Sequence, residues 1–412
     1  MTGARAEHPA RRRAFNGLWL GSAISNTGDG VRMAALPLLA VTLTTSPFLV
    51  ASITTAQFLP WLVFGPIGGA LVDRWRRRQI IIVVQLVRAG IMLALMVAVV
   101  ADAAAIWQLY VVAFAITFGE ILVDPATIAL VPTLVERDEL DQANGRIVST
   151  EIVTNEFVGS PLGGAGFALA QWLPFGFDAA SYASSTVAFA RLPKSVALPR
   201  PASSMRADIG EGFRWLRHHP VLGPMTVVIA VFNFGAVAAG AMLVLLTTQV
   251  LGGAEATFGV ILAVGAFGAL LGSLAAMRVS RRLGRGRTLV GSFVIEGALL
   301  FAVSAAPNLP ALFGLWFVIG VPFGVWMPTA RTLQQRLTPP RLLGRVSTTG
   351  RMVTRGSMVV GSLLAGAIAT ATSVRTAISI GALAQLGAAA ALWLVLRRHD
   401  VDAMAATANH DE

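Results

Sequence analysis

Charged side chains that interrupt long apolar stretches are the residues of this chain best suited to chemistry. Asp29 and Arg32 lie about one helical turn apart in one such stretch, and Glu120 and Asp124 lie one turn apart in another. A charge at the centre of a bilayer costs about 2.5–3.5 kcal/mol on insertion scales, so such residues are functional candidates by default. Carboxylates in that setting can take up and release protons, because burial favours the neutral acid.

Metal, thiol and nucleotide chemistry have no support in the sequence. The chain has no cysteine, and its five histidines all lie outside the apolar stretches. It contains neither a phosphate-binding G-x-x-x-x-G-K-[ST] motif nor a zinc-binding H-E-x-x-H motif. We therefore expect no metal and no cofactor, and the sequence argues against both an enzyme and an ATP-driven pump.

The charged residues belong to polar stripes at helical spacing. One stripe consists of Ser22, Ser25, Asn26, Asp29 and Arg32, and a second of Thr117, Glu120, Asp124 and Thr127. Residues three and four positions apart share one face of a helix. Lipid cannot satisfy such a face, so we expect both stripes to line a central cavity.

Depth arithmetic suggests a partner for Arg88. At 1.5 Å per residue, Arg88 and Asp124 lie about 14 and about 15 Å above the inner ends of their helices. We expect a buried Arg88–Asp124 pair, which is either functional or purely architectural. Glu120 would then be the freer carboxylate, because Arg32 is close enough to neutralise Asp29. Two other acids fit more ordinary roles, with Glu296 snorkelling or bonded locally and Asp178 acting as a helix cap or an interfacial residue.

The composition identifies the elements that must carry these residues. The 412-residue chain is 55% hydrophobic and only 13% charged, about half the usual charge of soluble domains. Runs of about 20 apolar residues are long enough to span a bilayer. We predict an all-α membrane protein with twelve spans at 15–43, 48–72, 79–101, 105–134, 145–171, 174–192, 221–250, 256–279, 288–306, 309–335, 345–371 and 375–396.

Basic residues set the expected orientation. The chain has 32 Lys and Arg residues and a net charge of +11. Only Arg375 falls in the predicted outer loops, and Arg32, Arg88, Arg351 and Arg355 fall within spans. The positive-inside rule therefore places both termini and the central loop in the cytoplasm, as expected for a multi-pass protein of the inner membrane. Topology accounts for the net charge, so we do not expect a nucleic-acid partner.

Internal repeats indicate a duplicated six-helix unit. Gly65-x-x-x-Gly69 recurs as Gly268-x-x-x-Gly272, and Pro125 recurs as Pro328, both at an offset of 203 residues. The Gly159–Gly164 motif recurs at 361–366. Two such halves around a central cavity, 1–192 and 220–412, are typical of alternating-access transporters. The linker 193–219 is either a surface helix or an ordinary charged connector.

Motifs at the inner ends carry a family resemblance. After the second span the sequence reads Gly69-Ala70-Leu71-Val72-Asp73-Arg74-Trp75-Arg76-Arg77-Arg78. Here the chain resembles the major facilitator superfamily, and Ala143-Asn144-Gly145 and Glu211-Gly212-Phe213-Arg214 resemble its macrolide-efflux and enterobactin-exporter branch. The resemblance implies a gating loop with Gly69, Asp73, Arg74, Arg77 and Arg78, although Arg76 replaces the family's glycine.

A second motif resembles that of drug antiporters. Gly159, Pro161, Gly163 and Gly164 match its glycine-rich pattern with the proline displaced by one position. The fourth span lacks the arginine of many proton-coupled exporters, so coupling would differ in detail. We also expect the second span beside the eleventh. Asp73 would then contact Arg345 or Arg351, and Glu151 would contact Arg278 in the mirror position, as a gate between the halves.

Taken together, these features predict a secondary transporter rather than an enzyme. We expect a monomeric proton-coupled antiporter that exports amphipathic small molecules, a class associated with antibiotic resistance. The alternative is a dedicated exporter or importer of one metabolite, such as a siderophore.

Overall fold

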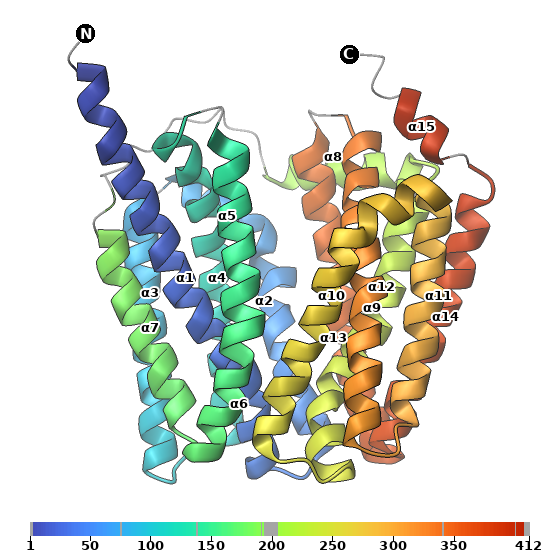
Figure 1. Cartoon of the computed structure of the whole chain (residues 1–412), viewed down its shortest axis with the longest axis horizontal. Coiled ribbons are helices and arrows are strands. Elements are labelled where there is room, and N and C mark those ends of the chain that lie inside the picture. The colour runs from blue at the N-terminus through green and yellow to red at the C-terminus, as the bar shows by residue number, and fades with distance from the viewer. Residues whose placement is uncertain are drawn as a thin grey trace. The chain divides into compact units, whose positions relative to one another are not determined.

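All regular secondary structure in the described part of the computed structural model is helical. The structure describes residues 3–74, 76–136, 139–190, 192, 205–339, 342–399 and 401–407, without the side chains of 3–11, 66–74, 129, 141, 205–209 and 405–407. Figure 1 shows the elements, which are α1 (Gly3–Leu43), α2 (Pro47–Arg74), α3 (Arg77–Val100), α4 (Ile106–Leu134), α5 (Leu140–Ile152), η2 (Val153–Gly159), α6 (Ser160–Leu169), α7 (Leu173–Ala190), α8 (Met205–His218), α9 (Leu222–Leu245), η3 (Leu246–Val250), α10 (Glu255–Leu283), α11 (Arg285–Ser304), α12 (Leu309–Leu337), α13 (Leu343–Ala371), α14 (Val374–Leu396) and α15 (Val401–Thr407).

Nine helices within the described residues are long and apolar enough to cross a membrane. Three predicted spans are not among them. The first coincides with α1, which carries the polar stripe, and the fifth is divided into α5, η2 and α6. The sixth is α7, which has only 18 residues and contains Asp178 and several hydroxyl groups.

The chain forms two compact units. The first unit comprises Met1–Leu43, Val63–Ala202 and Glu255–Ala263, and the second comprises Thr44–Leu62, Ser203–Ala254 and Val264–Glu412. Both α2 and α10 are thus divided between units. Each unit is described by itself below.

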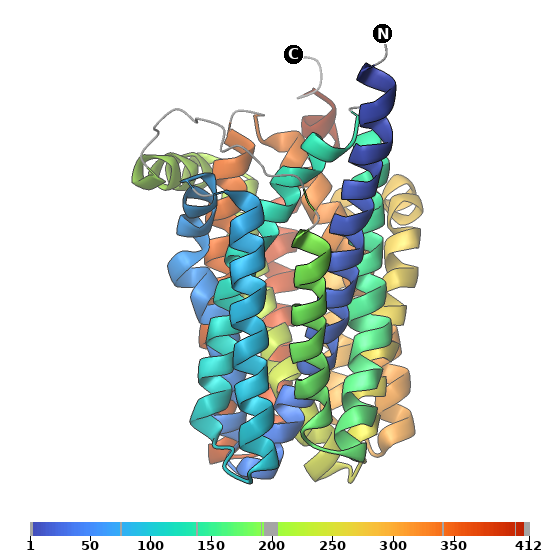
Figure 2. The ribbon, with the colours of Figure 1, turned by 90° about the vertical axis from the view of Figure 1, so that its left-hand side faces the viewer.

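In the first unit, α1 packs on α7, α7 on α3, and α3 on α4 (Figure 2). Glycines bring η2 and α6 close to α1. A Cβ added at Gly159 would lie 2.7 Å from the Thr27 carbonyl oxygen, and one at Gly163 would overlap the carbonyl of Val31. Only glycine permits this approach of backbones, which is how small residues let membrane helices pack closely.

The second unit has the same order of contacts among different helices. Here α9 packs on α14, α14 on α11, and α11 on α12, while α13 also covers α9. Gly361 of α13 approaches the Phe234 carbonyl oxygen of α9, at 2.8 Å from an added Cβ. Gly268 and Gly272 of α10 likewise meet the backbone of α12. These glycines let α13 and α10 pack closely on the backbones of α9 and α12.

The first part of α2 packs against α13 within the second unit, as the sequence predicts for the second and eleventh spans. Thr55 and Ser362 share a hydrogen bond of 2.7 Å between their hydroxyl groups. Arg355 places its guanidinium over the rings of Phe58 and Trp61, at 5.1 and 5.7 Å from their centres. This aromatic contact, rather than snorkelling, accounts for a charge within the predicted span.

The linker contains a short helix, α8, which is one of the two alternatives expected from the sequence, and 193–204 lie outside the described residues. In Figure 1, α8 lies across the ends of the long helices of the second unit, at the same end as α15. Gly212 lets it approach α13, because an added Cβ would be 2.7 Å from the Arg345 carbonyl oxygen. Glu211 and Arg345 form an ion pair across the same contact.

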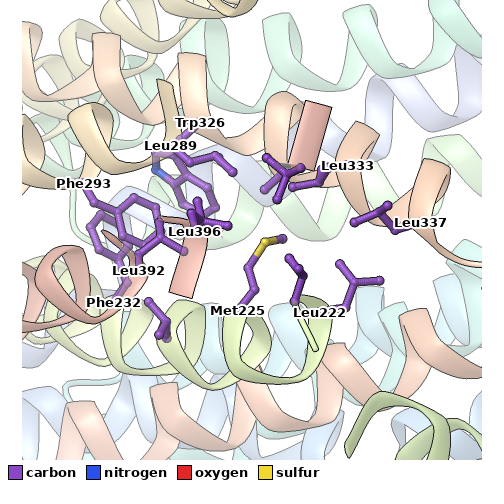
Figure 3. Close-up of a cluster of buried hydrophobic side chains, with 14 of the residues drawn as sticks. Leu222, Met225, Phe232, Leu289, Phe293, Trp326, Leu333, Leu337, Leu392 and Leu396 are labelled. Carbon is purple, nitrogen blue, oxygen red and sulfur yellow. The ribbon is translucent and has the colours of Figure 1, made fainter. Parts of the chain in front are cut away.

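Aromatic and aliphatic side chains form a core cluster within the second unit (Figure 3). Phe232 of α9 stacks on Phe293 of α11 with ring centres 3.7 Å apart. Trp326 of α12 packs edge-on against both rings, at 5.5 and 5.2 Å. The cluster has members from α8, α9, α11, α12, α13, α14 and α15, and its Trp326 donates a hydrogen bond to Glu296.

Candidate functional site

Arg32 of α1 is the centre of a buried charge network in the first unit. Its Nη2 donates to Asp29 Oδ1 at 2.8 Å and to Glu120 Oε1 at 3.3 Å. Its Nε lies 3.5 Å from Asp178 Oδ2 of α7. Arg32 is only 5% exposed, so these three carboxylates replace the water that a guanidinium loses on burial.

A second buried guanidinium, that of Arg88 in α3, extends the network. Its Nη2 lies 3.6 Å from Glu120 Oε1 and donates to the Ile116 carbonyl oxygen at 2.9 Å. Gly119 leaves room for it, because a Cβ there would lie 2.6 Å from Arg88 Nε. Glu120 of α4 is therefore shared by two cations.

Helix α7 supplies partners that the sequence analysis missed. Asp178 is fully buried and pairs with Arg32 instead of capping a helix. Tyr182 donates to Asp29 Oδ1 at 2.5 Å, and its ring lies under Arg88 at 5.2 Å from the guanidinium carbon. Ser185 accepts from Gln85 at 3.0 Å. The positions 178, 181, 182 and 185 share one face of a helix, so the same stripe argument would have found them.

The predicted Arg88–Asp124 pair is wrong. Asp124 is exposed and forms no ion pair with any residue whose side chain the structure describes, whereas Arg88 pairs with Glu120 one turn away. Glu120 is accordingly not the freer carboxylate. The hydrogen bond to Ile116 and the gap at Gly119 direct the Arg88 side chain toward Glu120. The predicted pairing of Asp29 with Arg32 is confirmed at 2.8 Å.

The remaining residues of the network take secondary positions. Asn26 of the same stripe is half-buried. Ser25 accepts a hydrogen bond of 3.0 Å from Gln85 Nε2. Two guanidinium groups thus face three carboxylates, which leaves one negative charge in excess when all three are ionised. Such a site has the charge to hold one proton or one cationic group.

The gating residues are only partly described. The backbone of Gly69, Asp73 and Arg74 belongs to the end of α2, but their side chains lie outside the described residues. Arg77 and Arg78 open α3, and Arg78 donates to the Ala190 carbonyl oxygen. The predicted contacts of Asp73 with Arg345 or Arg351, and of Glu151 with Arg278, would join the two units and stay predictions.

The glycine-rich motif contributes packing. Gly159 and Gly163 face α1, and Gly164 faces Gly259 of α10, at 3.1 Å from an added Cβ to the Gly259 Cα. Pro161 lies in the first turn of α6, where its missing N–H costs nothing. The π-helical turn η2 ends directly before α6, and no pattern in the sequence predicts it. Such turns often occur at functional sites.

A separate buried carboxylate, Glu296 of α11, lies in the second unit. It accepts hydrogen bonds from Trp326 Nε1 at 3.1 Å and Gln385 Nε2 at 3.4 Å. Among the residues with described side chains, no arginine or lysine forms an ion pair with it. Its role is the local bonding that the sequence analysis expected, and it is distinct from the network around Arg32.

Comparison with known proteins now identifies the family. The sequence model of the transmembrane secretion effector family, a group of major facilitator superfamily transporters, matches residues 4–412. The chain belongs to this family. This is a family of membrane transporters and not of enzymes, so the chain is a multi-pass membrane protein.

Individual members of this major facilitator family share only a low sequence identity with the chain. The chain is 28% identical to macrolide efflux protein A of Streptococcus pyogenes over 44% of its own length, and the match spans only 45% of that protein. It is 26% identical to the multidrug efflux pump Tap of Mycolicibacterium fortuitum, over 78% of this chain and 81% of that one. Efflux transporters are thus among the chain's relatives.

Solved structures support the fold. A bacterial homologue of the iron transporter ferroportin, in an inward-facing state, superposes with a TM-score of 0.76 at 16% identity, covering 93% of this chain and 98% of that one. At this identity the likeness concerns the fold alone. The all-helical architecture expected from the sequence is the major facilitator fold.

Proposed function

We propose that the chain is a proton-coupled exporter of amphipathic small molecules that works by alternating access. Twelve spans would form two six-helix halves, 1–192 and 220–412, joined by the linker 193–219 and surrounding one cavity. The repeated motifs support this arrangement, as does the matching order of helix contacts in the two units. The chain would lie in the inner membrane as a monomer with both termini in the cytoplasm.

The observation that carries the proposal is the unequal charge of the Arg32 network. Asp29, Glu120 and Asp178 surround two buried guanidinium groups. An excess negative charge inside a membrane is costly, and one proton removes it. A cationic group on a substrate would remove it equally well, so proton and substrate would compete for one site. Such competition is the basis of antiport.

Glu120 is the carboxylate best suited to exchange the proton. Its side chain is 28% exposed, against 12% for Asp29 and 0% for Asp178. Its contacts with the guanidinium groups, at 3.3 and 3.6 Å, are longer than that of Asp29 at 2.8 Å. Protonation of Glu120 would loosen α4 from α1 and α3, and thereby bias the conformation of the transporter.

The substrate class rests on the relatives. One is named for macrolide efflux and another for multidrug efflux, and macrolides are large amphipathic molecules with a basic amine. An excess carboxylate in the membrane suits an amine of that kind. Antiport and a part in antibiotic resistance follow as expectations of this proposal.

Transport by the purified chain in proteoliposomes tests this function. A panel of macrolides and other amphipathic amines is presented with a proton gradient, without a gradient, and with a protonophore. We expect at least one macrolide to move against its gradient only while the proton gradient persists. Movement that the protonophore leaves unchanged would refute proton coupling, and rejection of the whole panel would refute the substrate class.

A further inference from the structure

A basic groove opens at the arginine-rich ends of α10 and α12 in the second unit. It has a volume of about 1270 Å³, including its open mouth. The helix α15 closes one end through Asp402, which pairs with Arg285 at 2.8 Å and accepts from the Arg285 backbone N–H at 3.0 Å. The groove belongs to the second unit, whereas the Arg32 network belongs to the first.

The lining of the groove changes in character along the helices. Toward the middle of α10 and α12 it consists of Ser273, Ala276, Met277 and Pro328, and the Ser273 hydroxyl donates within its own helix to the Leu270 carbonyl oxygen. Met277 is 64% exposed and thus presents a long apolar side chain to whatever fills the groove. Hydroxyl groups follow, with Ser280 and Thr329 joined at 3.1 Å. The lining of the groove therefore changes from mainly apolar to polar over about two helical turns.

Three arginines form the polar end, namely Arg281, Arg285 and Arg336. Among the described residues, Asp402 is the only acid in the lining, and it neutralises Arg285. Arg281 and Arg336 are exposed and form no ion pair among the residues with described side chains. The groove consequently offers two guanidinium groups to an anion, and guanidinium groups bind phosphate oxygens well.

The dimensions of the groove fit one leaflet of a bilayer. Its lining on α10 runs from Ser273 to Gly284, which is about 17 Å at 1.5 Å per residue. The hydrocarbon layer of one leaflet is about 15 Å thick, half of the 30 Å core. A groove of this length is long enough for one lipid to extend from the tail region to the headgroup region.

We propose that the basic groove binds one anionic phospholipid. Its phosphate contacts Arg281 and Arg336, and an acyl chain lies along Met277. Basic pockets between membrane helices are known to suit anionic headgroups. The bound lipid would link α10, α12 and α15 and so stabilise the folded second unit. This role is independent of the proposed transport activity and of the identity of its substrate.

The test measures thermal unfolding of the full chain in a neutral detergent. The probes are dioctanoyl phosphatidylglycerol, dioctanoyl phosphatidylcholine and inorganic phosphate. We expect only phosphatidylglycerol to raise the unfolding midpoint in a saturable manner, because a ligand of the native state stabilises it. Equal protection by inorganic phosphate would identify a free-anion site, and equal protection by phosphatidylcholine would remove the role of charge; either result overturns the proposal.

Variants locate the binding site. The pair Arg281→Gln/Arg336→Gln should weaken the apparent affinity for phosphatidylglycerol about thirty-fold, if each arginine contributes about 1 kcal/mol. The matched control Arg282→Gln/Arg331→Gln removes the same charge from the same helices outside the groove, and should keep the affinity. Met277→Asp should also weaken lipid binding, since it puts a charge on the apolar wall. Equal losses in the control pair, or none in the first pair, would contradict the assignment.

Discussion

At the scale of single residues, Arg32 has the largest part in the buried network. It is the only side chain among those described that contacts Asp29, Glu120 and Asp178 together. Glu296 shows the contrasting solution in the second unit, where a buried carboxylate is held by neutral donors from Trp326 and Gln385. Among the described residues, the first unit thus gathers several buried charges around Arg32, whereas Glu296 of the second unit is buried among neutral donors.

Removal of Arg32 should be costly, and the cost should depend on Asp178. Breaking a buried ion pair by deleting one partner typically costs about 3–5 kcal/mol, because the other charge is stranded. We expect Arg32→Gln to lower the thermal-unfolding midpoint strongly, and Arg32→Gln/Asp178→Asn to recover part of the loss. Thermal unfolding of both single variants and the double variant measures this coupling. If the drop in unfolding midpoint of the double variant equals the sum of the drops of the two single variants, Arg32 and Asp178 do not interact.

The sequence predicted which residues are buried charges better than it predicted their partners. Helical rise gives the height of each Cα, and it correctly put Arg88 near the carboxylates of α4. It does not give the direction of a long side chain. The Arg88 side chain points toward Glu120 because it donates to the Ile116 carbonyl oxygen and occupies the space left by Gly119. Asp178 was assigned an ordinary role because its neighbours on the helix face were not considered together.

At the scale of elements, glycines determine how closely α6 and η2 approach α1. Gly163→Ala would place a Cβ against the backbone carbonyl of Val31, which cannot move without shifting α1. Gly166 of the same helix meets only the side chains of Leu173 and Pro174, the nearest atom at 3.6 Å. The two positions therefore form a matched pair.

We expect Gly163→Ala to lower the unfolding midpoint and Gly166→Ala to leave it unchanged or raise it. Alanine favours a helix over glycine by about 1 kcal/mol, so only the steric overlap can make the first change harmful. Thermal unfolding in detergent distinguishes the two. A harmless Gly163→Ala would mean that α1 and α6 do not need this close contact.

The start of α9 carries a pH-sensitive cap. His219 Nδ1 accepts hydrogen bonds from the backbone N–H groups of Val221 and Leu222, at 3.2 and 3.0 Å. A protonated imidazole has no acceptor, so protonation would break this cap. Burial, and secondarily the charge of His399, lower the pKa of His219 from its ordinary value of 6.5.

The sign of the pH dependence follows from that shift. The unfolded chain binds the proton more readily, so stability falls as pH drops through 6.5 and levels off below the lowered pKa of folded His219. His219→Asn keeps an acceptor at the same place and removes the titration. Unfolding midpoints from about pH 8 to about pH 5 should show a smaller decrease for this variant than for the unmodified chain. Identical profiles would exclude His219 as the titrating group.

Element boundaries were predictable where apolar runs were long, as in α3, α9 and α14. The π-helical turns η2 and η3 were not, because they arise from packing and leave no pattern in the sequence. The helix α8 corresponds to one of the two alternatives that the linker sequence left open, a surface helix or a charged connector. Its pairing with α13 through Glu211 and Arg345 was not predicted, because Glu211 alone resembles an ordinary surface charge and Arg345 was expected to contact Asp73.

At the scale of the whole molecule, the distribution of arginines predicts the orientation in the membrane. Reporter fusions after residues 76, 140, 205, 284 and 341 should give cytoplasmic signals, and fusions at 46, 103 and 253 should give external signals. The reason is that translocating an arginine-rich loop is unfavourable. An external signal at residue 205 would contradict the arrangement of two six-helix halves.

The central claim, that the Arg32 network couples proton and substrate through Glu120, is tested most directly by proton flux per transported substrate in proteoliposomes. Glu120→Gln mimics the protonated acid, and it should abolish proton-driven transport while downhill exchange of substrate continues. Asp102→Asn is the matched control, since Asp102 is an exposed loop residue with φ of 52° that asparagine tolerates well. We predict unchanged coupling in the control and none in Glu120→Gln; intact proton flux per substrate in Glu120→Gln would contradict the account.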